Sequence, residues 1–343
     1  MKRLKNLLAA TLVLGCAAVN AADMGAAPIT LISPFPPGGG TDTLTRMMAS
    51  AIGQDRGWNM VVENKPGAGG NLALDATARA RPDGHTLVMA QTDNIVLNPW
   101  LYNKLSYDTF KDFRPIGPVA TSPSVFVVLP DSPFKTVADV VKAAQARPGQ
   151  VSLGIPGIGG TGDLTGYLWR KAANIELMHV PYRGWGQAFP DLASGRIDMY
   201  VGSVASLLPQ IRGGKVRALA VVAKDRAPAL PDVPTFAENG FKGLDQSIWW
   251  GLMAPAKTPD DVVATLNQAL QAVQSNPELV KKLEDAGYSI LKGTPDDLAR
   301  QRVVHLDQYS GRPLLANDPH LGLGAPALWY FAHLKAPQGR ASD

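Results

Sequence analysis

Cysteine is almost absent from this sequence. Its single cysteine, Cys16, lies in an apolar N-terminal segment that we expect to be removed. The mature chain would then form no disulfide and could not hold a metal through thiolates. The five histidines are not spaced as metal-binding pairs, and His179, inside a predicted strand, is expected to be a hydrogen-bonded structural residue. We therefore predict no metal site.

Long apolar runs and a large excess of charge are also missing beyond the N-terminus. Three basic residues among the first five precede an apolar stretch over 7–18, which is too short to span a bilayer. This pattern is typical of a signal peptide, here 1–22, with cleavage near Ala21 or Ala22 and a lipoprotein at Cys16 as the alternative. The remainder has 30 basic and 29 acidic residues, which does not support nucleic-acid binding. We expect a soluble periplasmic protein.

Motifs of common enzyme classes are missing as well. The sequence has no G-x-S-x-G elbow and no phosphate loop ending in Gly-Lys-Ser/Thr. Residues 157–162 fit the G-x-G-x-x-G pattern of dinucleotide-binding proteins, but the next strand, 177–181, is not followed by the acidic residue that would hold a ribose. We predict no catalytic residues and no cofactor, and keep an α/β enzyme as a remote alternative.

Short apolar runs alternate regularly with helical segments along the chain. The predicted strands are 29–33, 58–64, 86–90, 124–130, 151–154, 177–181, 197–201, 216–222 and 249–255. The predicted helices are 42–54, 71–80, 136–146, 161–173, 185–194, 203–212, 259–274 and 277–286. This rhythm predicts an α/β fold with parallel-type sheets, in two halves.

Two glycine-rich loops, 38–42 and 157–162, each join a strand end to a helix N-terminus. The first N–H groups of a helix are unpaired and carry partial positive charge, and glycine lets a ligand approach the backbone closely. Each loop alone could be an ordinary tight turn, with Asp42 as an N-cap. Two such loops, one in each half, predict a clamp for a small anion such as a carboxylate.

Seven stretches of the sequence share their form and order with one known family. They are "ITLISPFPPGGGTD" (29–42), "VVENKPGAGGNLA" (61–73), "RPDGHTLVMA" (81–90), "GIGGTGDL" (157–164), "HVPYRGWGQAFPDLASGRID" (179–198), "GKVRALAVVAKDRAPALPDVPTFAENGF" (214–241) and "WWGLMAPAKTPDDVVATLNQAL" (249–270). They resemble the Bug-type substrate-binding proteins of the tripartite tricarboxylate transporter family.

The resemblance implies a type II periplasmic-binding-protein fold, in which two lobes enclose a cleft. Lobe one would be discontinuous, 28–124 and 248–307, and lobe two would be 125–247. The chain departs from the family pattern after about residue 301. Residues 308–343 are therefore expected to be a divergent tail that packs poorly, through either a shifted reading frame or genuine divergence.

The resemblance also implies which residues bind a small organic carboxylate. They are Phe35, Pro36, Gly38, Gly39, Thr41 and Asp42 in the first loop, Gly159, Gly160 and Thr161 in the second, Thr92 and Asn94 after a strand, and Tyr182 and Asp198 at strand ends facing the cleft. The implied partners are integral-membrane transporter subunits or, in an alternative role, a sensor kinase. The protein is expected to be a monomer, and the identity of its ligand is not predicted.

Overall fold

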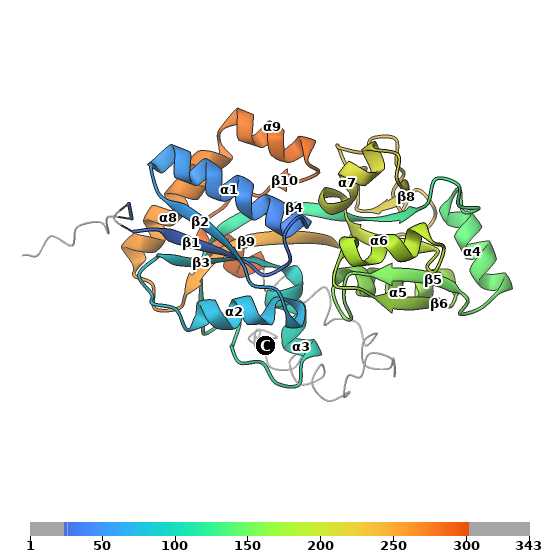
Figure 1. Cartoon of the computed structure of the whole chain (residues 1–343), viewed down its shortest axis with the longest axis horizontal. Helices are drawn as coiled ribbons and strands as arrows, with labels where there is room; N and C mark the ends of the chain where they lie inside the picture. Colours follow the sequence, from blue (N-terminus) through green and yellow to red (C-terminus); the bar gives the residue numbers. More distant parts are fainter. Residues whose placement is uncertain (1–23, 26, 302–343) are drawn as a thin grey trace, which may run out of the picture.

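The computed structural model describes residues 24–25 and 27–301, which form two lobes joined by long strands (Figure 1). The predicted signal peptide over 1–22, with Cys16, and the predicted tail over 308–343 lie outside the described residues. Within the described part of the chain, no helix is both long enough and apolar enough to cross a membrane.

Lobe one contains every strand and helix predicted for it. Its strands are β1 (Ile29–Ser33), β2 (Met60–Asn64), β3 (Thr86–Gln91), β9 (Ser247–Pro255) and β10 (Ser289–Ile290), and its helices are α1 (Gly40–Arg56), α2 (Asn71–Ala78), α3 (Asn98–Leu101), α8 (Asp260–Gln274) and α9 (Pro277–Asp285). β1 pairs in parallel with β2 and β3, and β3 pairs antiparallel with β9. The C-terminal ends of β1 and β3 therefore meet at one edge of the sheet.

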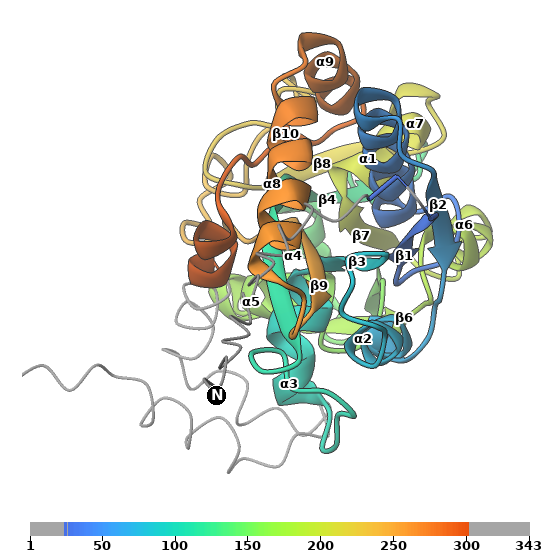
Figure 2. The ribbon, with the colours of Figure 1, turned by 90° about the vertical axis from the view of Figure 1, so that its left-hand side faces the viewer.

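The alternation of side chains along β1 explains how lobe one forms layers. Leu31 packs with α1 and α8 on one face of the sheet, and Ile32 packs with α2 on the other. Figure 2 shows α1 and α8 above these strands and α2 below them. The sheet is therefore covered on both sides, as its apolar strands require.

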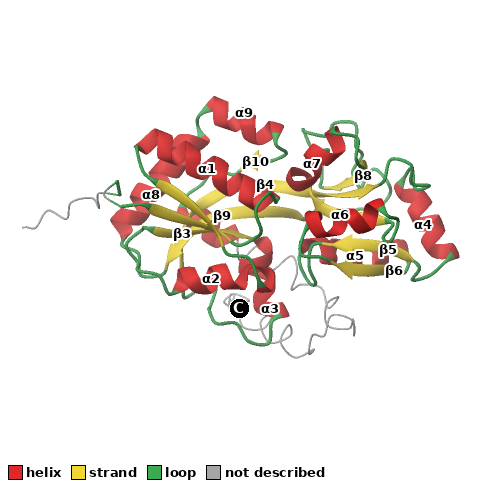
Figure 3. Cartoon of the chain, viewed as in Figure 1, coloured by secondary structure: helices red, strands yellow, loops and turns green. Residues whose placement is uncertain are grey.

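Lobe two repeats this plan with its own strands and helices. They are β5 (Val151–Ile155), β6 (Leu177–Pro181), β7 (Met199–Ser203) and β8 (Arg217–Val222), with α4 (Val137–Ala146), α5 (Thr161–Ala173), α6 (Trp185–Ala193) and α7 (Val204–Arg212). β5 pairs in parallel with β6 and β7. Helices again flank the strands (Figure 3). In the core Phe126, Trp169 and Phe236 meet edge to face, with ring centroids 5.1–5.2 Å apart.

One long strand, β4 (Phe113–Val128), belongs to both lobes. Its first part pairs with β9 in lobe one, and its last part pairs with β7 and β8 in lobe two. The sequence predicted a strand only from residue 124, whereas the strand begins at Phe113 and includes Pro115, Pro118 and Pro123, which lack the N–H that a strand residue normally donates. The structure accommodates Pro115 and Pro118 at register shifts in the pairing with β9, where the ladder is already interrupted. The prediction thus placed the start of this strand too late.

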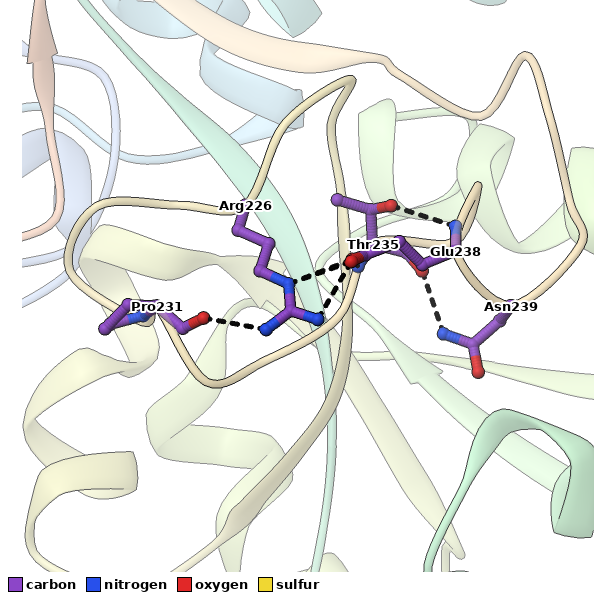
Figure 4. Close-up of polar contacts among 5 residues, drawn as sticks. All are labelled: Arg226, Pro231, Thr235, Glu238 and Asn239. Carbon is purple, nitrogen blue, oxygen red and sulfur yellow. Dashed lines mark hydrogen bonds and ion pairs between the residues drawn. The ribbon is translucent and has the colours of Figure 1, made fainter.

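The segment between β8 and β9, residues 223–246, is held by a surface clamp (Figure 4). The Arg226 guanidinium donates to both carboxylate oxygens of Glu238, at 2.8–3.1 Å, and to the carbonyl of Pro231 at 3.0 Å. Glu238 also accepts from the N–H of Thr235 at 2.6 Å. This bidentate arrangement organises a stretch that contains no long helix or strand of its own.

Candidate functional site

The loop after β1 and the loop after β5 have the same backbone design. In each, a glycine with positive φ precedes an N-cap glycine: Gly38 (φ 81°) and Gly39 in the first, Gly159 (φ 73°) and Gly160 in the second. Residues with side chains are strained at such φ values, which explains glycine at Gly38 and Gly159. Because the N-cap glycines have no side chain to cap the helix, the first N–H groups of α1 and α5 can meet acceptors from elsewhere.

A carboxylate at the third helical position holds each loop in place. Asp42 Oδ2 accepts a hydrogen bond from the Gly38 N–H at 2.9 Å, and Asp163 Oδ2 accepts one from the Gly159 N–H at 2.7 Å. His179 Nδ1 lies 2.5 Å from Asp163 Oδ1. The prediction that His179 is a hydrogen-bonded structural residue is therefore confirmed.

Asp42 has further partners within lobe one. Its side chain accepts from Asn64 Nδ2 at 2.7 Å and from Arg46 Nε at 3.1 Å, and the residue is only 3% exposed. Burial raises the pKa of the Asp42 carboxyl, but the hydrogen bonds from Arg46, Gly38 and Asn64 and the charge of Arg46 outweigh burial and hold that pKa below its ordinary value. These contacts make Asp42 a support for the loop, and its role in binding the ligand stays a prediction.

A chain of hydrogen bonds connects the two loops across the lobes. Thr41 Oγ1 accepts from Trp250 Nε1 at 2.9 Å and donates to Gln91 Oε1 at 3.0 Å. Gln91 Nε2 lies 3.4 Å from Asp93 Oδ2, and Asp93 Oδ1 accepts from the Thr161 N–H at 3.0 Å and from the Thr161 hydroxyl. Burial raises the pKa of Asp93, although the bonds from Thr161 oppose this shift. The N-terminal turns of α1 and α5 therefore flank one place between the lobes.

Direct packing at both loops shows that the lobes are closed against each other. A Cβ placed on Gly40 would lie 3.3 Å from Ser203 Oγ, at the start of α7 in lobe two. A Cβ placed on Gly159 would lie 2.4 Å from the side chain of Leu101 in lobe one. Glycine at these two positions is thus what permits the lobes to approach so closely.

The predicted residues after β3 are buried and shape a π-helical turn, Asp93–Leu97. Thr92 Oγ1 accepts from the Trp249 N–H at 3.0 Å, which ties this turn to β9. Asn94 Oδ1 accepts from the Gln91 N–H at 3.0 Å, while its Nδ2 has no hydrogen-bond partner among the described residues. Thr92 and Asn94 therefore hold the turn that carries Asp93.

The remaining residues of the first loop lie at its outer end. Phe35 is half-buried and Pro36 is exposed, and the Phe35 carbonyl accepts from Asn64 Nδ2 at 3.0 Å. Asn64 thus bonds both to this carbonyl and to Asp42. The loop is fixed from within lobe one at both of these points.

Tyr182 and Asp198 are not brought together at the second loop. Tyr182 follows β6, near that loop, but its hydroxyl donates to Asp191 at 2.9 Å; burial and this hydrogen bond raise the pKa of Tyr182 to about 12. Asp198 precedes β7 and accepts from the N–H and hydroxyl of Ser152, at the start of β5. Since β5 and β7 run in parallel, Asp198 lies at the opposite edge of the sheet from Gly159. The prediction that Asp198 faces the cleft at a strand end is therefore corrected.

The sequence reasoning missed Gln91 and Asp93, which connect the loops. A signal was present, because Asp93 stands between the predicted residues Thr92 and Asn94 and is the only acid in an otherwise uncharged stretch, 86–103. In the described ranges, no group of three or more His, Cys, Asp or Glu side chains is arranged so that it could hold a metal ion. The groups at this place are backbone N–H donors, the Thr41 and Thr161 hydroxyls, the Gln91 amide, the Trp250 indole N–H and the Asp93 carboxylate, a set suited to holding a ligand.

Comparison with known proteins identifies a family to which this chain is similar. The model of the tripartite tricarboxylate transporter family receptor matches residues 44–308. A UPF0065 protein from the tcbD-tcbE intergenic region of Pseudomonas sp. (strain P51) is 40% identical over 79% of this chain and 81% of its own length. BugT of Bordetella pertussis is 31% identical over 82% and 86% of the two chains.

Solved structures share the two-lobed fold. The periplasmic binding protein BugD is 32% identical with a TM-score of 0.77, covering 82% of this chain and 95% of its own. An R. palustris protein with adipate is 29% identical with a TM-score of 0.81, covering 86% and 97%. MatC from Rhodopseudomonas palustris, with bound malate, is 29% identical with a TM-score of 0.76, covering 82% and 97%.

A second family model, penicillin amidase, matches residues 302–342. These residues lie outside the described part of the chain, and the match overlaps the receptor match only over 302–308. The receptor match spans both lobes, including both strand crossings between them. Its extent, and the fold shared with BugD, establish that the chain belongs to the Bug-type receptors of the tripartite tricarboxylate transporter family.

Proposed function

We propose that this protein is exported to the periplasm, captures a small organic carboxylate between its lobes and delivers it to the membrane subunits of a tripartite tricarboxylate transporter. The observation that carries this proposal is the duplicated loop, with the N-terminal turns of α1 and α5 flanking one interlobe place. The adipate and malate held by structural relatives are both carboxylates, which supports the ligand class. Capture needs no nucleophile or cofactor.

The energetics of such a site are sufficient for useful affinity. A hydrogen bond to a charged group contributes about 1.5–3 kcal/mol, and the dipole of a helix N-terminus adds roughly 0.3–2 kcal/mol. Three or four such contacts, less the entropic costs of association, reach the roughly −8 kcal/mol of micromolar binding. The membrane partner would then recognise the conformation in which the lobes are closed around the ligand.

The test of ligand class compares carboxylates with their neutral amides in thermal unfolding. Butyrate, hexanoate, benzoate, succinate and adipate would each be paired with the corresponding amide. A ligand present at about 100 times its Kd stabilises the folded protein by about 2.7 kcal/mol, which raises Tm by several degrees. We expect at least one acid to raise Tm where its amide does not. If every acid behaves like its amide, carboxylate capture is wrong.

Delivery requires a separate measurement. Cells that express the membrane subunits of a tripartite tricarboxylate transporter would take up the labelled ligand only when this protein is also present in the periplasm. Ligand binding in calorimetry without any effect on uptake would retain the binding role and remove the transport role.

A further inference from the structure

Asp93 places a carboxylate of the chain itself on the second loop. It extends from lobe one, directly after β3, and Asp93 Oδ1 accepts both the N–H and the hydroxyl of Thr161, the first residue of α5. A Cβ placed on Gly160 would lie 2.8 Å from Asp93 Oδ2. Both carboxylate oxygens therefore lie against the N-terminal turn of α5.

The contacts of Asp93 suit its ionised form. The Thr161 N–H, the Thr161 hydroxyl and Gln91 Nε2 can all donate to Asp93, and these hydrogen bonds stabilise the ionised carboxylate against the burial that raises its pKa. The partial positive charge at the start of α5 compensates the negative charge. Asp93 thus occupies the position that an anionic end of a ligand would take at this helix.

The first loop differs from the second in this respect. Within residues 27–301, no carboxylate accepts a hydrogen bond from the N–H groups of Gly39, Gly40 or Thr41. Asp42, the acid of that loop, bonds to Gly38, Asn64 and Arg46. The two loops share their backbone design, but only the second is supplied with an internal anion from the opposite lobe.

We propose that Asp93 determines specificity: by filling the anion position of the second loop, it selects ligands that bring one carboxylate, bound at the first loop, and rejects those that bring a second one. This rests on the proposed carboxylate capture. A dicarboxylate spanning the cleft would place its second charge beside Asp93, and two like charges in a partly desolvated place repel strongly. This chain would therefore differ from the relatives that hold adipate or malate.

The experiment measures the affinities of matched monocarboxylates and dicarboxylates by calorimetry at neutral pH. Hexanoate is paired with adipate and butyrate with succinate, so that chain length is constant within each pair. The proteins are the wild type, Asp93→Ala, Asp93→Asn and the control Asp131→Asn, which removes one exposed negative charge from lobe two. Asp93→Asn removes the charge and keeps one oxygen that can accept from Thr161, but it replaces the other oxygen by an NH2 donor.

The expected result is a reversal of preference. The wild type and Asp131→Asn should bind the monocarboxylate of a pair more tightly by at least about tenfold, which corresponds to 1.4 kcal/mol. Asp93→Ala should gain at least about tenfold for the dicarboxylate with little change for the monocarboxylate, and Asp93→Asn should change in the same direction. If Asp93→Ala does not fold, by circular dichroism, the Asp93→Asn result decides.

Other results would overturn the proposal in distinguishable ways. If the wild type binds the dicarboxylate at least as tightly and the Asp93 variants keep that preference, Asp93 does not select the ligand. If both Asp93 variants weaken both ligands equally, Asp93 only supports the closed lobes. In either case carboxylate capture stands. If no protein binds any carboxylate, the proposed function fails and the selectivity proposal fails with it.

Discussion

Asp42 and Asp163 show how single residues prepare the two loops. Each carboxylate turns back from the third position of its helix to the N–H of the positive-φ glycine. A buried carboxylate is stable only when hydrogen bonds and charges compensate its lost hydration. Asp42 obtains that compensation from Arg46 and Asn64, and Asp163 obtains it from His179. Supporting contacts of this kind compensate the burial of both carboxylates.

We predict that Asp42→Asn destabilises the protein in a pH-dependent way. Because the folded-state pKa of Asp42 lies below its ordinary value of 3.8, its contribution is fully present at neutral pH and is lost as pH falls through that lowered pKa. The difference in unfolding free energy between wild type and variant should be about 1–3 kcal/mol at neutral pH and should shrink below about pH 4. Urea unfolding across this range measures it.

The matched control for this prediction is Asp55→Asn, which changes an exposed acid near the other end of α1. It should alter stability by no more than about 0.5 kcal/mol at any pH. A difference between wild type and Asp42→Asn that stays constant down to pH 3 would show that the charge of Asp42 is not what holds the loop.

At the level of elements, glycine in the loops after β1 and β5 meets two requirements, a positive φ and close packing between the lobes. Gly38 and Gly159 both have positive φ, so a side chain would strain the backbone at either position. Only Gly159 is also covered from the opposite lobe, by Leu101, whereas nothing lies within 4 Å of a Cβ placed on Gly38. The two positions therefore separate backbone strain from interlobe contact.

We predict that Gly159→Ala opens the lobes and that Gly38→Ala does not. Both changes should cost about 1 kcal/mol or more in backbone strain. Gly159→Ala adds a methyl group where Leu101 packs. The radius of gyration of this variant in small-angle X-ray scattering should therefore exceed that of the wild type. Leu101→Ala in the same chain should restore the compact form. Equal scattering from both glycine variants would contradict this role of Gly159.

For the whole molecule, β4 is the feature that joins the lobes. It contributes hydrogen bonds and buried side chains to both sheets, and β9 pairs with it up to Pro123, where the second sheet begins. At this crossing the Ser122 hydroxyl donates to the Gly287 carbonyl and accepts from the Ala205 N–H. Neither sheet can lose its structure without exposing part of the strand that it shares with the other.

We predict that the two lobes unfold in one cooperative transition. Differential scanning calorimetry should show a single peak with van't Hoff and calorimetric enthalpies that agree. Trp169→Phe, which leaves space in the lobe-two core, should lower the Tm of the single peak by about 1–2 °C for each 1 kcal/mol lost and should not divide the peak. A variant trace with two peaks, only one of them shifted, would show that the lobes are independent.

The sequence alone determined the order of strands and helices, because apolar periodicity and helix caps are local. It also indicated both glycine loops, because a strand end, a glycine run and a helix start are adjacent in the chain. It missed the short elements α3 and β10 and the first half of β4, where two prolines lie beside β9 at register shifts that no local pattern reveals.

Only the tertiary structure decided which side chains meet between the lobes. Asp93 reaches Thr161 because the chain crosses at β4 before it forms the second loop, 68 positions later. Asp198 lies far from that loop because β5 and β7 are parallel and it stands at their beginning. Contacts of this kind depend on strand direction and lobe closure, which no local pattern of residues specifies.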